Sequence, residues 1–307
     1  MYQKANRRSD VSRILKAASF VALGSVVGAC GSAPENVADE RPVPQEQPFS
    51  TELSGEPVHE EITAEGLAFL QPAIINAIQA ANVSVDTEFA LVNANHFDDC
   101  NFVGGATVIR SFQEEAVASL DPSQPPGVGD AEALAAFGRW LHTTQDFYAH
   151  SNWVELGAQT LADDSLAKWP AWKGYETLTP TGFRLVDGNP PARTSVTRKE
   201  DAPYPQNVIV RVKQAKNQNP GVISGSVDYE PGDDCPPSVR IAHADLNKDH
   251  SDTAGRTAQF VIAKRLAVEQ THHEWCRLTA MTRAAWGEAG VTRLMTWAAD
   301  SSAAQCP

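Results

Sequence analysis

Residues 139–153 combine two histidines and an aspartate with large aromatic side chains. His142, Asp146 and His150 follow one another at intervals of four residues. In an α-helix, with about 100° of rotation per residue, these side chains lie within about 80° of one another on one face. Imidazole and carboxylate groups at this spacing can close on a metal ion, and zinc accepts both donors. The stretch therefore predicts a helix that carries a metal site.

The aromatic neighbours of these three residues predict that the helix lies in the core. They are Trp140, Phe147, Tyr148 and Trp153. A buried network held only by hydrogen bonds is the alternative to a metal site. We favour the metal, because burying so many polar groups costs free energy unless each has a strong partner.

The first 29 residues have the pattern of a targeting signal. A basic segment precedes an apolar run over residues 17–29, which is too short to span a bilayer. The run ends in Val27-Gly28-Ala29-Cys30, which resembles a lipobox, the cleavage site before a cysteine that then carries lipid. We expect residues 1–29 to be a lipoprotein signal peptide and Cys30 to anchor an exported chain to a membrane, the outer one in a Gram-negative cell. An ordinary secretory signal is the alternative.

The charge of the chain bears on its partners. Removing residues 1–29 takes away five basic residues and one acidic residue, so the formal charge of −13 falls to about −17. A basic platform for nucleic acid is therefore absent from the sequence, and phosphate backbones are repelled unless bound metal reverses the field locally.

Four cysteines remain after the signal: Cys100, Cys235, Cys276 and Cys306. In an oxidising compartment an even number favours two disulfides, and three pairings are possible. No two of them form a CxxC pair, so a structural zinc site built from cysteine is not expected.

Composition divides the mature chain into a tether and one domain. Residues 30–57 are polar and rich in Pro, Glu and Ser, which is typical of a flexible tether. We assign residues 58–300 to a single helical metal-binding domain, followed by a short tail over 301–307. Residues 168–237 are rich in proline and glycine and form a loop-rich insertion, with a small β-hairpin that uses the apolar run at 208–212.

Apolar periodicity predicts a mainly α-helical domain. The expected helices cover residues 59–83, 107–120, 130–156, 254–280 and 281–299. Asp130 is the expected N-cap of the central helix, and Gly287 and Gly290 lie near the join of the last two.

The stretch LHTTQDFYAHSNWVELG, residues 141–157, resembles the signature of the heterokaryon-incompatibility protein C family and of the related helical region of a von Willebrand factor A-containing protein. More distantly, the alternation of histidine and aspartate is similar to zinc-dependent phospholipase C and the single-strand-specific zinc nucleases. Residues 59–63, 95–98 and 246–250 resemble further motifs of the family. The resemblance implies a multi-helix domain of the phospholipase C and nuclease type.

The resemblance also implies a larger ligand set. It favours His59 and His96 as zinc ligands beside His142, Asp146 and His150. The alternative for His59 is a capping or surface role. Asp98 closely follows His96, and its alternative role is to form an Asx turn. His243, where the chain returns from the insertion, would complete the site.

The chain departs from the zinc phospholipases in two respects. Those enzymes use a mature N-terminal tryptophan as a ligand, whereas Cys30 takes that position here. They also carry a His-x-x-x-Glu pair, whereas His272-His273-Glu274 has the wrong spacing for one helical face. We expect His250, His272 and His273 to lie outside the site, and one to three zinc ions, with two favoured.

The expected activity is phosphodiester hydrolysis of the phospholipase C type. Zinc would supply hydroxide at neutral pH, and a second ion would hold a phosphoryl oxygen. Asp98 would orient the attacking water. A phospholipid substrate is favoured because of the lipid anchor, and a nuclease is less favoured because the chain is acidic. A binding or scaffold lipoprotein with a structural metal is the contrasting class, distinguished by a closed coordination shell.

Overall fold

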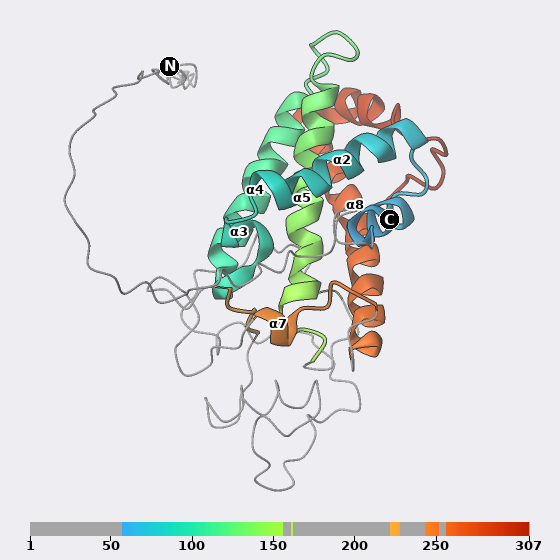
Figure 1. The fold of residues 1–307 in the computed structure, drawn as a ribbon. Coiled ribbons are helices and arrows are strands. Elements are labelled where there is room, and N and C mark those ends of the chain that lie inside the picture. The colour runs from blue at the N-terminus through green and yellow to red at the C-terminus, as the bar shows by residue number, and fades with distance from the viewer. Residues whose placement is uncertain (1–56, 156–160, 162–221, 228–242, 252–255, 307) are drawn as a thin grey trace, which may run out of the picture. The chain divides into compact units, whose positions relative to one another are not determined.

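The computed structural model describes residues 57–155, 161, 222–227, 243–251 and 256–306, all within one compact unit, Gln45–Pro307. These residues are mainly helical, which confirms the expectation of a mainly α domain (Figure 1). The elements are α1 (Val58–Gly66), α2 (Pro72–Glu88), α3 (Asn93–His96), the 3-10 helix η1 (Asp98–Cys100), α4 (Phe102–Ser119), α5 (Asp130–His150), α7 (His243–Leu246) and α8 (Thr257–Met295). The signal peptide, Cys30, the tether up to residue 56 and the strand at 208–212 lie outside the described residues.

Helix α5 lies at the centre of the bundle (Figure 1). It packs against α2, α4 and α8, and every residue from Trp140 to His150 is buried. The aromatic-rich stretch therefore forms a core helix, as predicted, but it ends at His150, short of the expected end at residue 156. The cause is Ser151, whose extended backbone (φ −91°, ψ 164°) pairs with Ser224 instead of continuing the helix.

The start of α5 also differs from the prediction. Asp130 is the first helical residue and not the N-cap, because Gly129 takes that position with a left-handed backbone (φ 85°). A Cβ atom at Gly129 would lie 2.4 Å from the backbone oxygen of Ser119. The carboxylate of Asp130 instead pairs with Arg293 of α8 at 2.8 Å.

The first expected helix, over residues 59–83, is two helices. Helix α1 ends at Gly66, where a Cβ atom would lie 2.8 Å from the side chain of Thr271 on α8. Pro72 then occupies the first turn of α2, a position where its missing N–H costs nothing. The break lets α1 pack against α8 and α2 against α5.

The two expected closing helices are one long element, α8, with a break inside it. Gly287 interrupts the helix with non-helical angles (φ 62°, ψ −157°). Only glycine adopts this backbone without strain, so the join falls at Gly287 rather than at 280.

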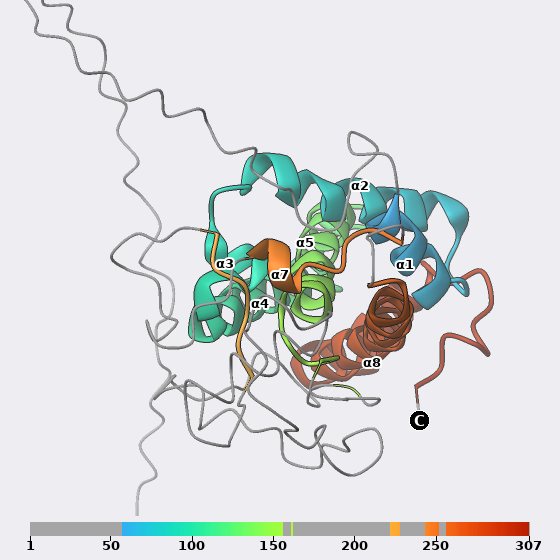
Figure 2. The same cartoon turned by 60° about the horizontal axis from the view of Figure 1, so that its bottom comes forward.

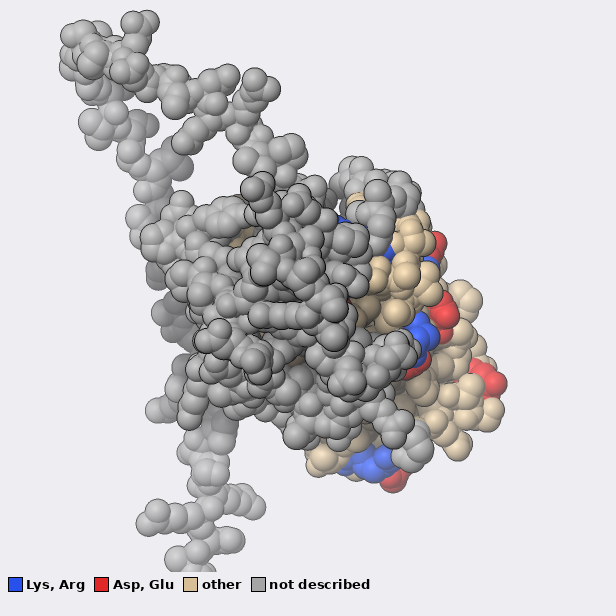
Figure 3. Space-filling model, turned by 90° about the horizontal axis from the view of Figure 1, so that it is seen from below, with Lys and Arg blue, Asp and Glu red and all other residues tan. Residues whose placement is uncertain are grey.

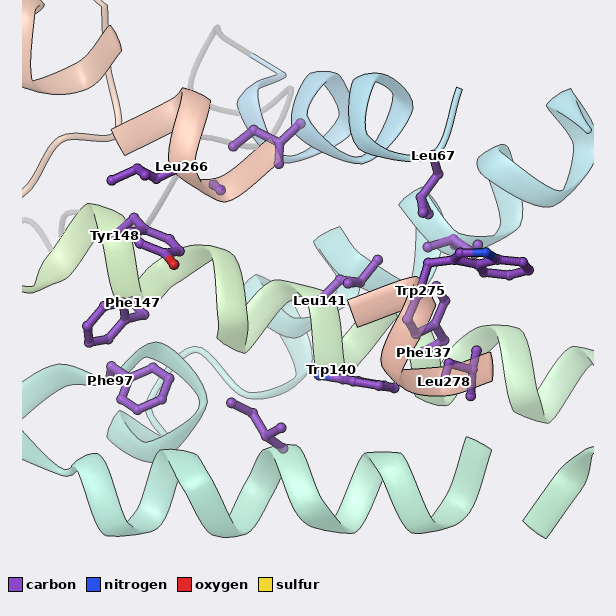
Figure 4. Packing of buried hydrophobic residues seen from close by; sticks show 14 of the residues in the cluster. Leu67, Phe97, Phe137, Trp140, Leu141, Phe147, Tyr148, Leu266, Trp275 and Leu278 are labelled. Atoms are coloured by element: carbon purple, nitrogen blue, oxygen red, sulfur yellow. The ribbon is translucent and has the colours of Figure 1, made fainter. Parts of the chain in front are cut away.

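Aromatic side chains hold α5 against its neighbours. Figure 4 shows Phe147 beside Phe97 and Phe137 beside Trp275, with ring centroids 5.6 Å and 6.4 Å apart. Trp140 is also fully buried. This packing restrains α5, so its polar side chains are presented in fixed positions.

One of the two expected disulfides, Cys276–Cys306, lies within the described residues and ties the tail to α8. Cys235 lies outside them. Among the helices in the described ranges, none is both long and apolar enough to cross a bilayer.

Candidate metal centre

Five buried side chains from four helices meet beside the middle of α5. They are His59 of α1, Asp86 of α2, His96 of α3, and His142 and Asp146 of α5, and we call them the first group. His142 Nε2 lies 3.0 Å from Asp146 Oδ2 and 3.2 Å from His96 Nδ1. It also lies 3.4 Å from Asp86 Oδ1. His59 Nε2 approaches Asp146 Oδ1 at 3.3 Å, and His96 Nδ1 lies 2.8 Å from Asp146 Oδ2.

In each histidine of the first group, the ring nitrogen on the outer side already has a hydrogen-bond acceptor. His96 Nε2 donates to the backbone oxygen of Phe89 at 3.3 Å. His142 Nδ1 donates to the side-chain oxygen of Asn82 at 3.2 Å, and His59 Nδ1 donates to that of Gln145 at 2.7 Å. The nitrogen that faces the centre is therefore the one available to bind a cation.

Gln145, which we call the hub, forms hydrogen bonds with four side chains and so orients His59 and Asn82. Its amide nitrogen donates to the hydroxyls of Thr63 and Thr271, at 3.2 Å and 3.0 Å. Its oxygen consequently faces His59 and also accepts a hydrogen bond from Asn82 at 3.1 Å. The amide links α1, α2, α5 and α8 around the first group.

The first group attracts positive charge. Both carboxylate oxygens of Asp86 and Oδ1 of Asp146 are buried, and none of them accepts a hydrogen bond within the described ranges. Burial raises the pKa of Asp86 to about 7. Burial lowers the pKa of His59, but Asp146 and Asp86 outweigh it and raise that pKa to about 9. Without a metal, the group therefore draws in protons.

A zinc ion fits this arrangement. Ligand atoms about 2.0–2.1 Å from a tetrahedral ion are about 3.3 Å from one another, and the contacts within the first group span 2.8 to 3.4 Å. The donors are imidazole nitrogens and carboxylate oxygens, the types that zinc accepts. Burial also lowers the pKa of His142 to about 3, which keeps its ring neutral and able to act as a ligand.

A second group lies at the C-terminal end of α5, where α7 crosses it in both Figure 1 and Figure 2. It consists of Asp98, His150, His243 and Asp249, all buried. Asp98 Oδ1 lies 2.9 Å from His243 Nδ1 and 3.2 Å from His150 Nδ1. On the far side of the His150 ring, Nε2 lies 3.4 Å from Asp249 Oδ1.

Hydrogen bonds explain the position of Asp98 without a metal. His150 Nδ1 also lies 2.9 Å from the backbone oxygen of His96, which can only accept, so this nitrogen carries a proton. The side-chain nitrogen of Asn247 donates to His243 Nε2 at 3.1 Å, so His243 Nδ1 is a donor as well. Asp98 thus accepts from two imidazoles. Burial raises its pKa, but His243 and His150 outweigh burial and hold that pKa below its ordinary value.

The donors left for a cation in the second group are His150 Nε2 and the carboxylate of Asp249. None of these three atoms takes part in a hydrogen bond within the described residues. Burial lowers the pKa of His150, but Asp98, Asp146 and Asp249 raise it well above its ordinary value. This end of α5 therefore also favours a positive charge.

A strained turn presents Asp98 to the two histidines. Phe97, Asp99 and Cys100 have φ angles of 56°, 55° and 58°, left-handed values that cost a non-glycine residue about 1–3 kcal/mol each. The turn is held by residues 222–227: Asp99 N–H donates to the backbone oxygen of Gly225 at 2.8 Å.

The same segment joins the turn to α5 and α7. Gly225 N–H donates to the backbone oxygen of His150 at 3.0 Å, and His243 N–H donates to that of Ser226 at 2.9 Å. A Cβ atom on Gly225 would lie 2.5 Å from His243 Cα, so the approach requires glycine. This part of the expected insertion is an element of the site.

The structure sorts the six predicted ligands and Asp98, the predicted catalytic carboxylate, into two groups. His59, His96, His142 and Asp146 meet in the first group, and Asp98, His150 and His243 meet in the second. His250, His272 and His273 are partly exposed and lie outside both.

Sequence reasoning missed Asp86 and Asp249 as donors. Asp249 lies inside the 246–250 motif, so the sequence offered a clearer signal for it than for Asp86. Asp86 has only a four-residue spacing from Asn82 to indicate it.

The fold and the site define a class: an α-helical domain with buried histidine–aspartate groups that could hold a metal ion. Residues 60–169 match the family model of the VWA7 N-terminal domain. That range spans α2 to α5 and stops before the segments that carry His243 and Asp249. Comparison with curated proteins and with solved structures gave no match. The likeness to heterokaryon-incompatibility, phospholipase C and nuclease families stays a prediction.

Proposed function

We propose that this chain holds two zinc ions along α5 and uses them to hydrolyse phosphodiesters. The observation that carries the proposal is the contact of His96 Nδ1 with His142 Nε2, 3.2 Å apart. The outer nitrogens of both rings already donate, so in the neutral rings two lone pairs face one another beside buried carboxylates. A proton on one ring would turn this contact into a hydrogen bond, whereas a metal ion between the two nitrogens would bind both lone pairs and the neighbouring carboxylates together.

The number of donors supports two ions rather than one. The first group supplies five side chains, more than a tetrahedral ion needs. The second group supplies His150 Nε2 and Asp249. Burial is the main cause that raises the pKa of Asp86, and the charge of Asp249 adds to it, so Asp86 also feels the second group. We assign the first ion to the first group and the second ion to His150 and Asp249.

Charge balance is compatible with an anionic substrate. Asp86, Asp98, Asp146 and Asp249 bring four negative charges, and two divalent ions bring four positive charges. The loaded centre is then neutral, so the ions remove the repulsion that these buried carboxylates would exert on a phosphodiester anion. Bound zinc would supply an acidic water and stabilise charge on the phosphoryl group.

Within this proposal, residues of the second group orient the attacking water and position the donors for the second ion. Asp98 is the carboxylate that orients the attacking water, and its contacts with His150 and His243 keep it ionised. His150 keeps its Nε2 directed at Asp249 because His96 holds the other side of its ring.

A membrane phospholipid is the proposed substrate class, because the lipobox would place the protein at a membrane. On the described part of the face in Figure 3, acidic and basic side chains are interspersed, with no basic patch among them. This distribution and the formal charge of −13 disfavour a nuclease.

One observation favours a structural metal in a scaffold lipoprotein instead. His59, His142 and Asp146 have no exposed surface. A catalytic ion needs an open coordination position that substrate can reach, whereas a structural ion is closed.

Elemental analysis followed by turnover separates the two. The zinc-loaded protein is assayed with phosphatidylcholine vesicles, a chromogenic phosphodiester and single-stranded DNA, before and after chelation. We expect phospholipid turnover that chelator abolishes and zinc restores. Metal present at full stoichiometry without turnover of any substrate would favour the scaffold.

The membrane anchor has its own test. Cys30→Ser should prevent incorporation of radiolabelled fatty acid in cells that label the wild type. Equal labelling of the variant would disprove the lipobox interpretation.

A further inference from the structure

Lys248 is a lysine with no exposed side-chain surface, next to the second group. Its ammonium group donates three hydrogen bonds, to the backbone oxygens of Leu246 and Ser151 at 2.7 Å and 2.9 Å and to Glu155 Oε1 at 3.0 Å. An ammonium has three N–H groups, so all of them are used. Burial of this charge requires a structural gain to offset its desolvation.

The partners of Lys248 join two parts of the site. Ser151 directly follows His150 at the end of α5, whereas Leu246 ends α7. Lys248 therefore fastens residues 246–249 to the end of α5. Asp249 is the next residue, and its own N–H donates to the side-chain oxygen of Asn247 at 2.7 Å. Two contacts thus hold the backbone that leads into Asp249, just before its side chain turns toward His150.

The two groups are built with different rigidity. All five members of the first group lie on helices, and the three histidines are each oriented by a further hydrogen bond. Asp249 lies in a non-helical segment after α7. Donors on helices are held more precisely than donors on loops, so a cation finds the first group better preorganised.

We infer that the two metal positions have different affinities and fill in order, with Lys248 as the positioning residue that sets the affinity of the second. The inference rests on the two-ion centre proposed above. The ammonium group does not touch the ion; it acts through Asp249. Loss of Lys248 should release residues 246–249 from α5 and weaken the second ion, while the first group, on other helices, keeps its own.

The test is a metal titration of the full chain after chelator dialysis, with Co²⁺ followed by its absorption and Zn²⁺ by calorimetry. Wild type should show two classes of binding. Lys248→Met should weaken the second class by about tenfold to a hundredfold, as loss of an outer partner of a ligand does, and leave the first unchanged. The matched control is Lys264→Met, which removes a partly exposed lysine that pairs with Glu61.

A second variant guards against simple loss of folding. Lys248→Met leaves Glu155 facing an apolar side chain, and the double variant with Glu155→Gln removes that buried charge. A double variant that regains thermal stability while its second ion stays weak supports the positioning role. Recovery of both stability and second-ion affinity would show that Lys248 only neutralises Glu155, and would overturn the inference.

Failure of the proposed role of Lys248 can be distinguished from failure of the two-ion centre. Two binding classes in the wild type, both unchanged in Lys248→Met, would remove the role of Lys248 and leave the two-ion centre standing. A single class in the wild type would remove both proposals.

Discussion

The two groups of polar side chains along α5 reach similar burial by different routes. The first group is assembled by the bodies of α1, α2, α3 and α5, and its histidines are oriented by side chains such as Asn82 and Gln145. The second group depends on a left-handed turn at residues 97–100, the extended segment 222–227 and the 246–249 connection.

The difference shows that the donors of the first group are preorganised, whereas those of the second group depend on contacts between turns and connecting segments. A helix fixes a side chain through its own backbone hydrogen bonds, and packing of the helix then fixes it in space. A donor on a turn needs each of its contacts to form. Damage to the first group should therefore cost metal and stability together, whereas damage to the second should cost mainly the second ion and the rate.

The largest effect is expected in the first group. His142→Ala and Asp146→Ala should each bring bound zinc well below the wild-type stoichiometry. Removing one partner of a buried ionic set should also lower the free energy of unfolding by about 3–5 kcal/mol. Elemental analysis and urea unfolding measure both effects, with His273→Ala as the matched control outside both groups. Wild-type metal content in the two variants would contradict the assignment of the first group.

His150→Ala sharpens the comparison from the other side. Its ring faces Asp249 through Nε2, so we expect phosphodiester turnover to fall by orders of magnitude while the first ion remains. Thermal stability should fall less than in Asp146→Ala. Turnover assays on metal-loaded protein test this, and a variant that loses stability but not rate would assign His150 to the scaffold class.

Gln145→Met tests whether the hub orients the first group. The substitution keeps most of the volume but removes the oxygen that holds His59 at 2.7 Å. We expect zinc affinity to fall by about tenfold to a hundredfold at the tighter position. Gln113→Met on α4, another buried glutamine, is the control and should bind zinc as the wild type does. Equal affinity in both variants would mean that His59 needs no orienting partner.

Gly225→Ala should have the smallest effect on the whole fold. The added Cβ would lie 2.5 Å from His243 Cα and push α7 away, at a cost of about 1–3 kcal/mol. Second-ion binding should weaken and first-ion binding should not. Gly290→Ala crowds Trp286 on α8 instead and controls for overpacking elsewhere. Weakening of the first ion in Gly225→Ala would show that the groups are not separable.

The sequence was sufficient to predict the central helix and the first group in outline. Four-residue spacing and aromatic neighbours identify α5 directly, because the helical period is a local property. The break between Gly66 and Pro72 was missed, since the close approach of Thr271 that favours it comes from a distant helix. Asp86 was missed for the same reason.

The second group was only partly predictable. His150 follows from the helix, but its separation from the first group depends on the turn at 97–100 and on Gly225. These contacts join segments that are distant in the sequence, since Gly225 lies 126 residues from Asp99 and 75 residues from His150. No local pattern in 222–227 indicates them. A loop-rich composition favoured a peripheral role for this segment, whereas its backbone joins three parts of the site.

Burial of α5 from Trp140 to His150 also determines which parts of the protein can open to solvent. We expect amide protons in such a helix to exchange with solvent only in openings as large as global unfolding, and those of residues 246–251, most of which are non-helical, to exchange through smaller local openings. Opening of residues 246–251 would then limit the rate at which the second ion exchanges. Radiolabelled zinc at this position should turn over at the rate of local amide exchange in 246–251, and zinc in the first group at the far slower rate of α5.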